Sequence, residues 1–283
     1  MKKITVISGK GGTGKTSIAG SFAVFADSEA VMADGDVDAA NLSLIMKHKL
    51  LEEHEFRASS IAKIDPEQCN QCGLCRDLCR FSAISGEYVV NPVACEGCAL
   101  CYHACPSRAV SMEETVSGYW FVSETPYGSL VHARLGIAEE NSGKLVTTVR
   151  NRAQELAKET GKEYVIIDGP PGIGCPVIAS LSGVDLALIV TEPTVSGIHD
   201  LERVVAVCDH FGVPVSVCIN RYNLDEKQSA AIARYCHDRG IHLAGKIPFD
   251  RLFVEAMLAG VPVTAFRQGS LYADIREIWD QLA

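Results

Sequence analysis

A glycine-rich loop near the start of the chain has the residues and the spacing to bind phosphate. Residues Gly9 to Thr16 read GKGGTGKT and fit the pattern G-x-x-x-x-G-K-[ST]. The apolar run Ile4 to Ile7 precedes the loop, and the run Ser17 to Ala26 that follows has helical spacing. Glycines let backbone N–H groups curl around a phosphate, and a helix N-terminus adds its dipole. We therefore predict that Lys15 reaches the β- and γ-phosphates of a nucleotide and that Thr16 binds Mg²⁺.

Carboxylates follow two further strand-like runs. Asp34 and Asp36 come after Val31 to Ala33, and Asp168 comes after Tyr164 to Ile167. Parallel strands bring their carboxyl ends to one edge of a sheet, where ligands bind. Carboxylates there can hold Mg²⁺ or its waters, or orient an attacking water. Each alone could instead cap a helix, an alternative that is weaker beside a phosphate loop.

Apolar runs alternate with helical stretches on both sides of a cysteine-rich segment. The runs Leu186 to Val190 and Val213 to Ile219 are followed by helical stretches at about 197–211 and 225–239, and residues 141–160 predict another helix. Continuous apolar strands alternating with helices indicate a sheet covered on both faces. We predict an α/β P-loop NTPase fold with a doubly wound, mostly parallel sheet.

Eight of the twelve cysteines stand in two runs with the same spacing. These are Cys69, Cys72, Cys75 and Cys79, and then Cys95, Cys98, Cys101 and Cys105. Each run has the bacterial ferredoxin spacing, in which the fourth cysteine ligates the other cluster. We therefore predict two 4Fe–4S clusters. The first set of ligands is Cys69, Cys72, Cys75 and Cys105, and the second is Cys79, Cys95, Cys98 and Cys101.

Structural zinc is the competing interpretation of the cysteine runs, because two sets of four cysteines could each bind one ion. The doubled spacing is far more specific for iron–sulfur ligation than a single CxxC pair. One departure from the ferredoxin pattern is Arg80, which follows the first run where Pro106 follows the second. We predict a P-loop ATPase domain made of residues 1–58 and 115–283, and an inserted two-cluster ferredoxin-like α+β domain at residues 59–114.

A second lysine in the loop, Lys10, makes the sequence resemble the deviant phosphate loop of the MinD/ParA/Mrp and nitrogenase-iron-protein class. The resemblance continues in the runs Asp34–Leu42, Thr191–Pro193, Asn220–Asn223 and Ile247–Asp250. Together with the cysteine runs, the chain resembles the MinD-superfamily ATPases that contain an inserted ferredoxin domain. Members of that group are commonly described as redox or metallocluster-assembly ATPases.

The resemblance implies roles for particular residues. By it, Lys10 crosses a dimer interface to the partner's nucleotide, Asp36 orients the attacking water, and Asn220 reads adenine. It also implies an ATP-dependent dimer, formed with a second copy or with a paralogue. The expected catalytic residues are Lys10, Lys15, Asp36 and Asp168, and the expected magnesium ligands are Thr16, Asp34 and Asp168. The expected ATP-binding residues are Gly11, Gly12, Thr13, Gly14, Lys15, Thr16, Ser17, Gly172, Asn220, Arg221, Pro248, Phe249 and Asp250.

Two of these expectations concern the segment after Asp168. The residues from Asp168 to Gly172 fit the D-x-x-G pattern of a phosphate-sensing switch, in which the Gly172 N–H would face the γ-phosphate. Cys175 follows, at the offset where the nitrogenase iron protein has a cysteine that ligates a cluster shared by its dimer. We hypothesise that two Cys175 thiolates meet across an ATP-bound dimer and hold a metal or receive electrons. A small residue in a tight turn is the alternative.

Composition limits the partners and the compartment. The formal net charge is −9, and no run of lysines and arginines is present, so we expect no binding to nucleic acid. No apolar stretch approaches the roughly 20 residues of a membrane span, and the N-terminus lacks the pattern of a signal peptide. We expect a cytoplasmic protein that does not bind membranes, in which cysteines act as metal ligands or redox groups.

These features lead to one main functional hypothesis and two alternatives. The main hypothesis is a Mg²⁺-dependent ATPase that couples its nucleotide state to electron transfer or metallocluster assembly on an acceptor protein. The first alternative is a spatial-positioning ATPase of the MinD/ParA kind. The second is a passive iron–sulfur scaffold or carrier, whose clusters are cargo.

Overall fold

The computed structural model of the chain describes residues 1–136 and 142–283. These residues separate into two compact units. The first, called here the sheet unit, comprises Met1–His54, Trp120–Arg134 and the chain from Ser142 to Ala283. The second, called the cysteine unit, comprises Glu55–Tyr119 together with Leu135 and Gly136. The predicted insert, residues 59–114, lies within the cysteine unit.

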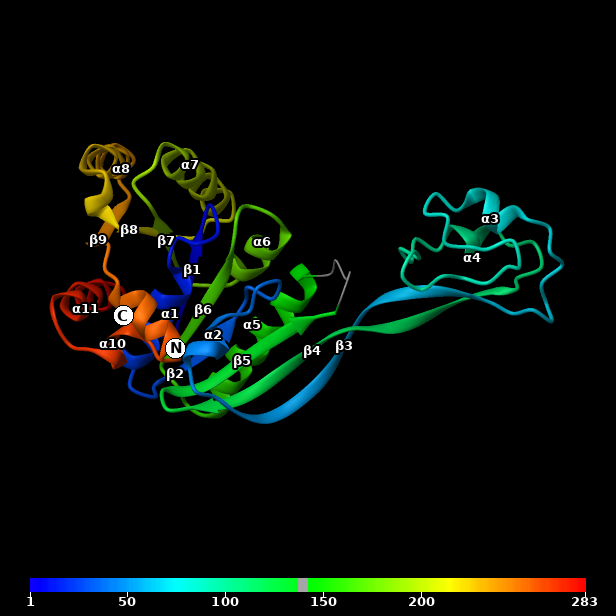
Figure 1. The fold of residues 1–283 in the computed structure, drawn as a ribbon, viewed down its shortest axis with the longest axis horizontal. Helices are drawn as coiled ribbons and strands as arrows, with labels where there is room; N and C mark the ends of the chain where they lie inside the picture. Colours follow the sequence, from blue (N-terminus) through cyan, green and yellow to red (C-terminus); the bar gives the residue numbers. More distant parts are fainter. Residues whose placement is uncertain (137–141) are drawn as a thin grey trace. The chain divides into compact units, whose positions relative to one another are not determined.

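One sheet runs through the described residues (Figure 1). Its strands are β1 (Lys2–Ser8), β2 (Ala30–Asp34), β3 (Lys49–Ile64), β4 (Val110–Thr125), β5 (Gly128–Leu135), β6 (Tyr164–Pro171), β7 (Leu186–Thr191), β8 (Val215–Asn220) and β9 (His242–Ile247). They lie in the order β3-β4-β5-β2-β6-β1-β7-β8-β9. Every pair from β5 through β9 in this order is parallel. Strands β3 and β4 contribute residues to both units.

Helices cover both faces of the parallel strands. One core cluster gathers residues of α1 (Lys15–Phe25), α2 (Leu42–Ile45), α9 (Leu252–Leu258), α10 (Val263–Phe266) and α11 (Ser270–Leu282). The other gathers residues of α6 (Cys175–Leu181), α7 (Val195–His210) and α8 (Glu226–Asp238), and α5 (Ser142–Glu159) packs beside α6. A single 3₁₀ turn, η1 (Tyr222–Leu224), follows β8 among the described residues. The sheet is therefore doubly wound.

The strand sequences explain this layering. In β1, Ile4 and Val6 belong to the first cluster and Ile7 belongs to the second. In β7, Leu188 joins the first cluster and Ile189 joins the second. Because successive side chains of a strand point to opposite faces, a strand buried on both faces must be apolar throughout. The predicted α/β fold with a mostly parallel sheet is confirmed.

The predicted helices correspond to observed ones with small shifts of their ends. The stretches at 197–211 and 225–239 are α7 and α8, and the stretch predicted at 141–160 is α5. Its predicted first position, residue 141, lies outside the described residues. Strands β3 and β4 were not predicted, because the first half of β3 is exposed and carries no continuous apolar run.

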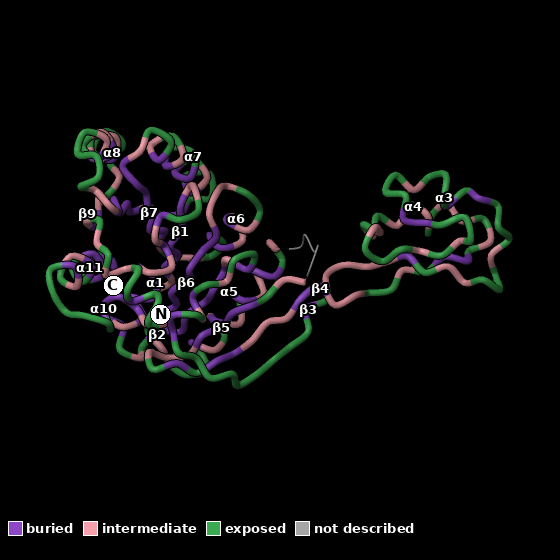
Figure 2. The backbone as a smooth tube through the Cα atoms, viewed as in Figure 1, coloured by how far each residue is buried: buried purple, intermediate pink, exposed green. Residues whose placement is uncertain are grey.

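The cysteine unit has little regular structure and a small core. Its part of β3 pairs with its part of β4 in opposite directions, as the Lys63–Glu113 ion pair at 2.8 Å and the Asp65 N–H bond to the Ala109 carbonyl at 2.8 Å show. Two short helices, α3 (Leu74–Leu78) and α4 (Leu100–Ala104), pack on each other. Figure 2 shows buried positions throughout the strands of the sheet unit and few of them around α3 and α4.

Candidate functional site

The phosphate loop joins β1 to α1 at the carboxyl end of the sheet. Gly12 and Gly14 have φ angles of 82° and 94°, in the left-handed region that favours glycine. A Cβ atom at Gly14 would also lie 2.5 Å from the Asn220 side-chain nitrogen. That nitrogen donates a hydrogen bond to the Thr13 carbonyl at 2.8 Å, which ties the loop to the end of β8. The loop is thus held in shape by packing that only glycine permits.

A cavity of about 610 Å³ opens beside this loop. Its volume lies within the range of small-molecule sites. Residues predicted to bind ATP that line it are Gly11, Gly12, Gly14, Lys15, Thr16, Ser17, Asn220, Arg221, Phe249 and Asp250, and the predicted catalytic Asp36 lines it as well. The structure therefore brings most of the predicted nucleotide site together, from segments far apart in the sequence.

Some predicted residues lie elsewhere. Thr13, Pro248 and Gly172 do not line the cavity. The Gly172 N–H, expected to face a γ-phosphate, donates instead to the Ser8 carbonyl at 2.8 Å. This bond extends the ladder between β6 and β1, so the neighbouring Pro170 and Pro171 line the cavity in place of Gly172.

Sequence reasoning missed one wall of the cavity. Leu44 and Ile45 of α2 and Phe253, Val254 and Met257 of α9 form this wall. The only sequence signal is that each helix follows a motif already singled out. Leu44, Val254 and Met257 are also exposed to solvent, so this apolar wall reaches the surface of the sheet unit.

Two buried carboxylates stand side by side below the loop. Asp34 of β2 pairs in register with Asp168 of β6, and both are fully buried. The Asp34 carboxylate accepts hydrogen bonds from the N–H groups of Leu42 and Asp36, at 3.0 and 3.3 Å. Neither Asp168 oxygen makes a hydrogen bond of regular geometry to another described residue, although the Thr16 hydroxyl is close enough to lower the pKa of Asp168. A buried carboxylate without a partner is costly, and a bound cation removes that cost.

The titration of these groups reflects their surroundings. Burial raises the pKa of Asp168 to about 7, against the lowering influence of the Thr16 hydroxyl and the Lys15 ammonium. Burial and then the nearby Asp168 charge raise the pKa of Asp34 well above its ordinary value. Burial also raises the pKa of Asp36, which the Lys15 charge lowers in part. The donor set of two carboxylates and the Thr16 hydroxyl, all oxygen ligands, fits Mg²⁺.

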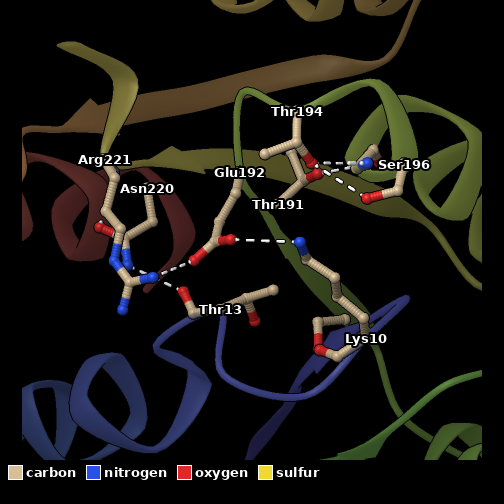
Figure 3. Close-up of polar contacts among 10 residues, drawn as sticks. Lys10, Thr13, Thr191, Glu192, Thr194, Ser196, Asn220 and Arg221 are labelled. Carbon is tan, nitrogen blue, oxygen red and sulfur yellow. Dashed lines mark hydrogen bonds and ion pairs between the residues drawn. The ribbon is translucent and has the colours of Figure 1, made fainter. Parts of the chain in front are cut away.

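Lys10 does not line the cavity of its own chain. Its ammonium lies 3.4 Å from a carboxylate oxygen of Glu192, just after β7, and Arg221 donates to the other oxygen of Glu192 (Figure 3). Glu192 belongs to the run Thr191–Pro193 that carries part of the family resemblance, but it was not predicted as a site residue. Its contact with Lys10 joins positions far apart in sequence, and no local pattern reports such a contact.

The eight run cysteines gather into two pockets of the cysteine unit. One pocket is lined by Cys69, Cys72, Cys75 and Cys105, and the other by Cys79, Cys95, Cys98 and Cys101. The structure thus groups the fourth cysteine of each run with the first three of the other, as the spacing predicts. No disulfide joins any cysteine in the described part of the chain.

The two runs also share backbone geometry. Positive φ angles occur at matching places, at Gln71, Gly73 and Ser82 in the first run and at Gly97, Ala99 and Arg108 in the second. Backbone N–H groups donate to cysteine sulfurs at matching places as well, from Ala83 to Cys79 at 3.4 Å and from Ala109 to Cys105 at 3.3 Å. Hydrogen bonds of this kind stabilise thiolates that ligate a metal.

The thiols within a pocket influence one another. Burial raises the pKa of Cys75, and the charges of Cys69, Cys72 and Cys105 raise it further. Within residues 1–136 and 142–283, no three His, Cys, Asp or Glu side chains are close enough to hold a single metal ion. A four-iron cluster takes its thiolates on separate irons, so its ligands surround the cluster rather than converge on one ion.

Cys175 is exposed at the first position of α6. The next residue, Pro176, lines the nucleotide cavity. Cys208, Cys218 and Cys236 are buried, and burial raises the pKa of each thiol, to about 12, 12 and 11. These three thiols stay protonated and act as core residues.

Comparison with known proteins places the chain in a family. The model of the CobQ/CobB/MinD/ParA nucleotide binding domain matches residues 4–263. The uncharacterized protein MJ0578 of Methanocaldococcus jannaschii is 40% identical over 227 residues, which cover 79% of each chain.

Solved structures share the fold. The MinD cell division protein of Aquifex aeolicus covers 100% of this chain and 97% of its own, with a TM-score of 0.61 at 18% identity. The septum site-determining protein MinD of Pyrococcus horikoshii OT3, solved in complex with Mg-ADP, covers 99% and 95%, with a TM-score of 0.57 at 18% identity. The MinD/ParA part of the expected relationship is confirmed, whereas the ferredoxin and nitrogenase parts stay predictions. The chain therefore belongs to the CobQ/CobB/MinD/ParA nucleotide-binding family.

Proposed function

We propose that this chain is a MinD/ParA-like ATPase whose cysteine unit holds two 4Fe–4S clusters, and that it couples its nucleotide state to electron transfer or metallocluster assembly on an acceptor protein. The observation that carries the proposal is the grouping of the eight run cysteines. They form two pockets in the crossed arrangement that ferredoxin ligation requires.

The nucleotide part of the proposal rests on the cavity beside the phosphate loop. Lys15 and the loop N–H groups would hold the β- and γ-phosphates of ATP. Thr16, Asp34 and Asp168 would hold Mg²⁺ directly or through water, and the ion would neutralise charge that develops on the phosphates. Asp36, half-buried in the cavity wall, would orient the attacking water. The Mg-ADP bound by the Pyrococcus MinD supports this assignment.

Two features of the cysteine unit favour bound clusters. The first is the donor set, because eight soft thiolates suit iron–sulfur ligation. The second is the small core. Its buried apolar residues other than cysteine are few, namely Phe56, Ala62, Ala83, Ile84, Ala109 and Val110. A unit of this size needs a further source of stability, and metal binding supplies it in many small domains.

Chain connectivity favours coupling between the two parts. Asp34, Asp36 and α2 precede β3 directly, and β3 enters the cysteine unit after His54. The segment that lines the nucleotide cavity is therefore continuous with the strand that leads to the cysteines. We propose that the cycle includes an ATP-bound dimer, with a second copy or a paralogue, in which Lys10 reaches the partner's nucleotide. The exposed Cys175 would hold a metal or receive electrons at that interface, and the protein would act in the cytoplasm.

Anaerobic reconstitution with iron and sulfide tests the cluster assignment. We expect about eight iron atoms per chain, and a spectrum of interacting 4Fe–4S centres after reduction, by electron paramagnetic resonance. Replacing Cys72 with Ser should remove the signal of one centre, whereas Cys236→Ala, which changes a buried core thiol, should leave both. Stoichiometric zinc in the protein purified without oxygen, with no iron uptake, would refute the assignment.

A second candidate function is spatial positioning, and the comparisons favour it more directly than the iron–sulfur function. The named structures that share the fold are MinD proteins of cell division and septum placement. Within the described residues, no helix is long and apolar enough to span a membrane. The apolar face of α11, including Leu271, Ile275 and Trp279, packs into the core and is not free to bind lipid. ATP-dependent pelleting with anionic liposomes or with DNA would establish positioning and count against a redox role.

A further inference from the structure

Glu192 lies between two cations that come from different strands. Its side chain is 11% exposed, and each carboxylate oxygen has its own partner. One oxygen is 3.4 Å from the Lys10 ammonium, and the other accepts a hydrogen bond from the Arg221 guanidinium (Figure 3). We call these three residues the Glu192 bridge.

The backbone fixes all three members of the Glu192 bridge. They follow β1, β7 and β8, which are neighbours in the sheet. The Ser8 hydroxyl donates to the Lys10 carbonyl at 2.6 Å, and the Thr194 N–H donates to the Glu192 carbonyl at 2.8 Å. Arg221 is held in a left-handed conformation, with φ of 56°, and its N–H donates to the Asn220 side chain at 2.9 Å. The approach of the charges is therefore built into the sheet.

The two cations differ in where they stand. Arg221 lines the nucleotide cavity, whereas Lys10 does not. The Lys10 side chain is 35% exposed, so its ammonium is held beside the cavity and remains open to solvent. The Glu192 bridge thus connects a residue of the cavity wall to the lysine that lies outside it.

We propose that Glu192 is a positioning residue that holds Lys10 away from its own nucleotide and releases it at low cost, because Arg221 keeps the carboxylate paired. A mostly buried carboxylate that loses its sole cation is strongly destabilised. With Arg221 in place, Glu192 keeps a guanidinium partner when Lys10 leaves, so the departure exposes no uncompensated charge. The positions of the three side chains do not depend on the proposed function. Only the role of the Glu192 bridge, which is to free Lys10 for a partner's nucleotide, rests on the proposed function.

This arrangement predicts opposite effects for the two neighbours of Lys10. Glu192→Gln removes the negative charge and frees the lysine. Arg221→Gln makes Lys10 the sole cation of a buried carboxylate, so Lys10 is held more tightly. If the contact only stabilised the fold, both substitutions would weaken the packing around Lys10, and the freedom of Lys10 would increase in both variants.

Competitive acetylation of the ligand-free full chain measures the freedom of Lys10. A trace of acetic anhydride reacts with accessible amines, and a bound carboxylate slows this reaction because it covers the amine and restricts its motion. Mass spectrometry gives the rate at Lys10 relative to that at Lys162. We expect Glu192→Gln to raise the Lys10 rate about two- to fivefold, and Arg221→Gln to lower it by about twofold or more. Arg221→Lys, which restores the cation, should return it towards the parent value.

Lys162 and Glu29 provide the matched control. Their ion pair has nearly the same length, 3.6 Å, and lies outside the nucleotide site. Glu29→Gln should raise the rate at Lys162 and leave the rate at Lys10 unchanged. If Glu192→Gln fails to fold, Glu192→Asp replaces it, since a shorter side chain weakens the contact with the same expected sign.

Equal rates in all variants, or a rise in both Glu192→Gln and Arg221→Gln, would overturn the proposal. Because the labelling uses no nucleotide, its outcome does not depend on ATP hydrolysis. Nucleotide binding is measured separately on the parent chain, by fluorescence of a labelled ADP. If the parent chain binds no nucleotide, the proposed ATPase activity is refuted, whereas the proposal for the Glu192 bridge is unaffected.

Discussion

The sheet unit and the cysteine unit differ in how much apolar surface they bury. In the sheet unit, strands buried on both faces and the helices around them bury large apolar side chains, such as Phe22, Met32 and Ile166. In the cysteine unit few apolar side chains are buried, and of the eight run cysteines only Cys75 is buried. Hydrophobic burial therefore preforms the nucleotide site, whereas the cysteine pockets have little apolar packing to support them.

Removal of bound metal should give the largest difference between the two units, measured as the protection of their amides against hydrogen exchange. Chelation of reconstituted protein should abolish the protection of cysteine-unit amides against hydrogen exchange, because the small core cannot replace the lost ligand bonds. Amides of β1, β6 and β7 should keep their protection. Equal loss in both units would show instead that the two units unfold together.

Loss of the loop lysine should impair only the sheet unit. Lys15→Ala should lower the kcat/KM of ATP hydrolysis by about 100-fold or more, because a charge on the transferring phosphate loses its partner. Cluster content should not change. Colorimetric phosphate release and iron analysis on the same preparations test both statements, and parent-level hydrolysis would contradict the assignment of Lys15.

The buried carboxylate pair should make the empty sheet unit pH-sensitive. The folded pKa of Asp168 is raised to about 7 from an ordinary value of 3.8, so the folded state holds the proton more tightly than the unfolded state. This stability is full below about pH 4 and is lost as pH rises through 7. Asp168→Asn should flatten that slope and raise stability at pH 8, on the order of 1–3 kcal/mol, in urea unfolding.

Magnesium provides the complementary measurement for Asp168. Since a cation favours the charged carboxylate, Mg²⁺ with ADP should stabilise the parent more at pH 8 than at pH 6. The Asp168→Asn variant should lose that difference. A parent whose stabilisation by Mg²⁺ does not change with pH would exclude Asp168 as a ligand.

A pair of glycine substitutions gives the smallest effect. Gly14→Ala should destabilise the sheet unit by about 1–3 kcal/mol, because its φ is 94° and its new Cβ would meet the Asn220 side chain. Gly11→Ala meets nothing within 4 Å and should change stability by less than about 1 kcal/mol. Thermal unfolding should show a clear fall in Tm for the first and little for the second. Similar shifts in both would mean that the loop is not rigidly packed.

The sequence reports contacts that are local or periodic. Apolar runs identify β1, β6 and β7, and the loop motif identifies Lys15 and Thr16, because the spacing itself carries the chemistry. The crossed cysteine sets are also local, since each run repeats one spacing. Strand β3 escaped prediction because its exposed residues give no apolar period.

Two contacts between distant segments were beyond prediction. The pairing of Lys10 with Glu192 depends on which strands are neighbours in the sheet. The hydrogen bond from the Gly172 N–H to the Ser8 carbonyl depends on the register of β6 against β1. Both follow from strand order, which no local pattern encodes.

The crossed cysteine pockets have a consequence for the order of synthesis. Cys105 stands in the pocket of the first run, and Cys79 stands in the pocket of the second. A ribosome releases the first run while Cys105 is still unmade, so neither pocket can be complete at that stage. The second pocket has all four of its cysteines once the chain has passed Cys101, whereas the first pocket still waits for Cys105. The first pocket is therefore the last to be complete, although three of its cysteines are made first.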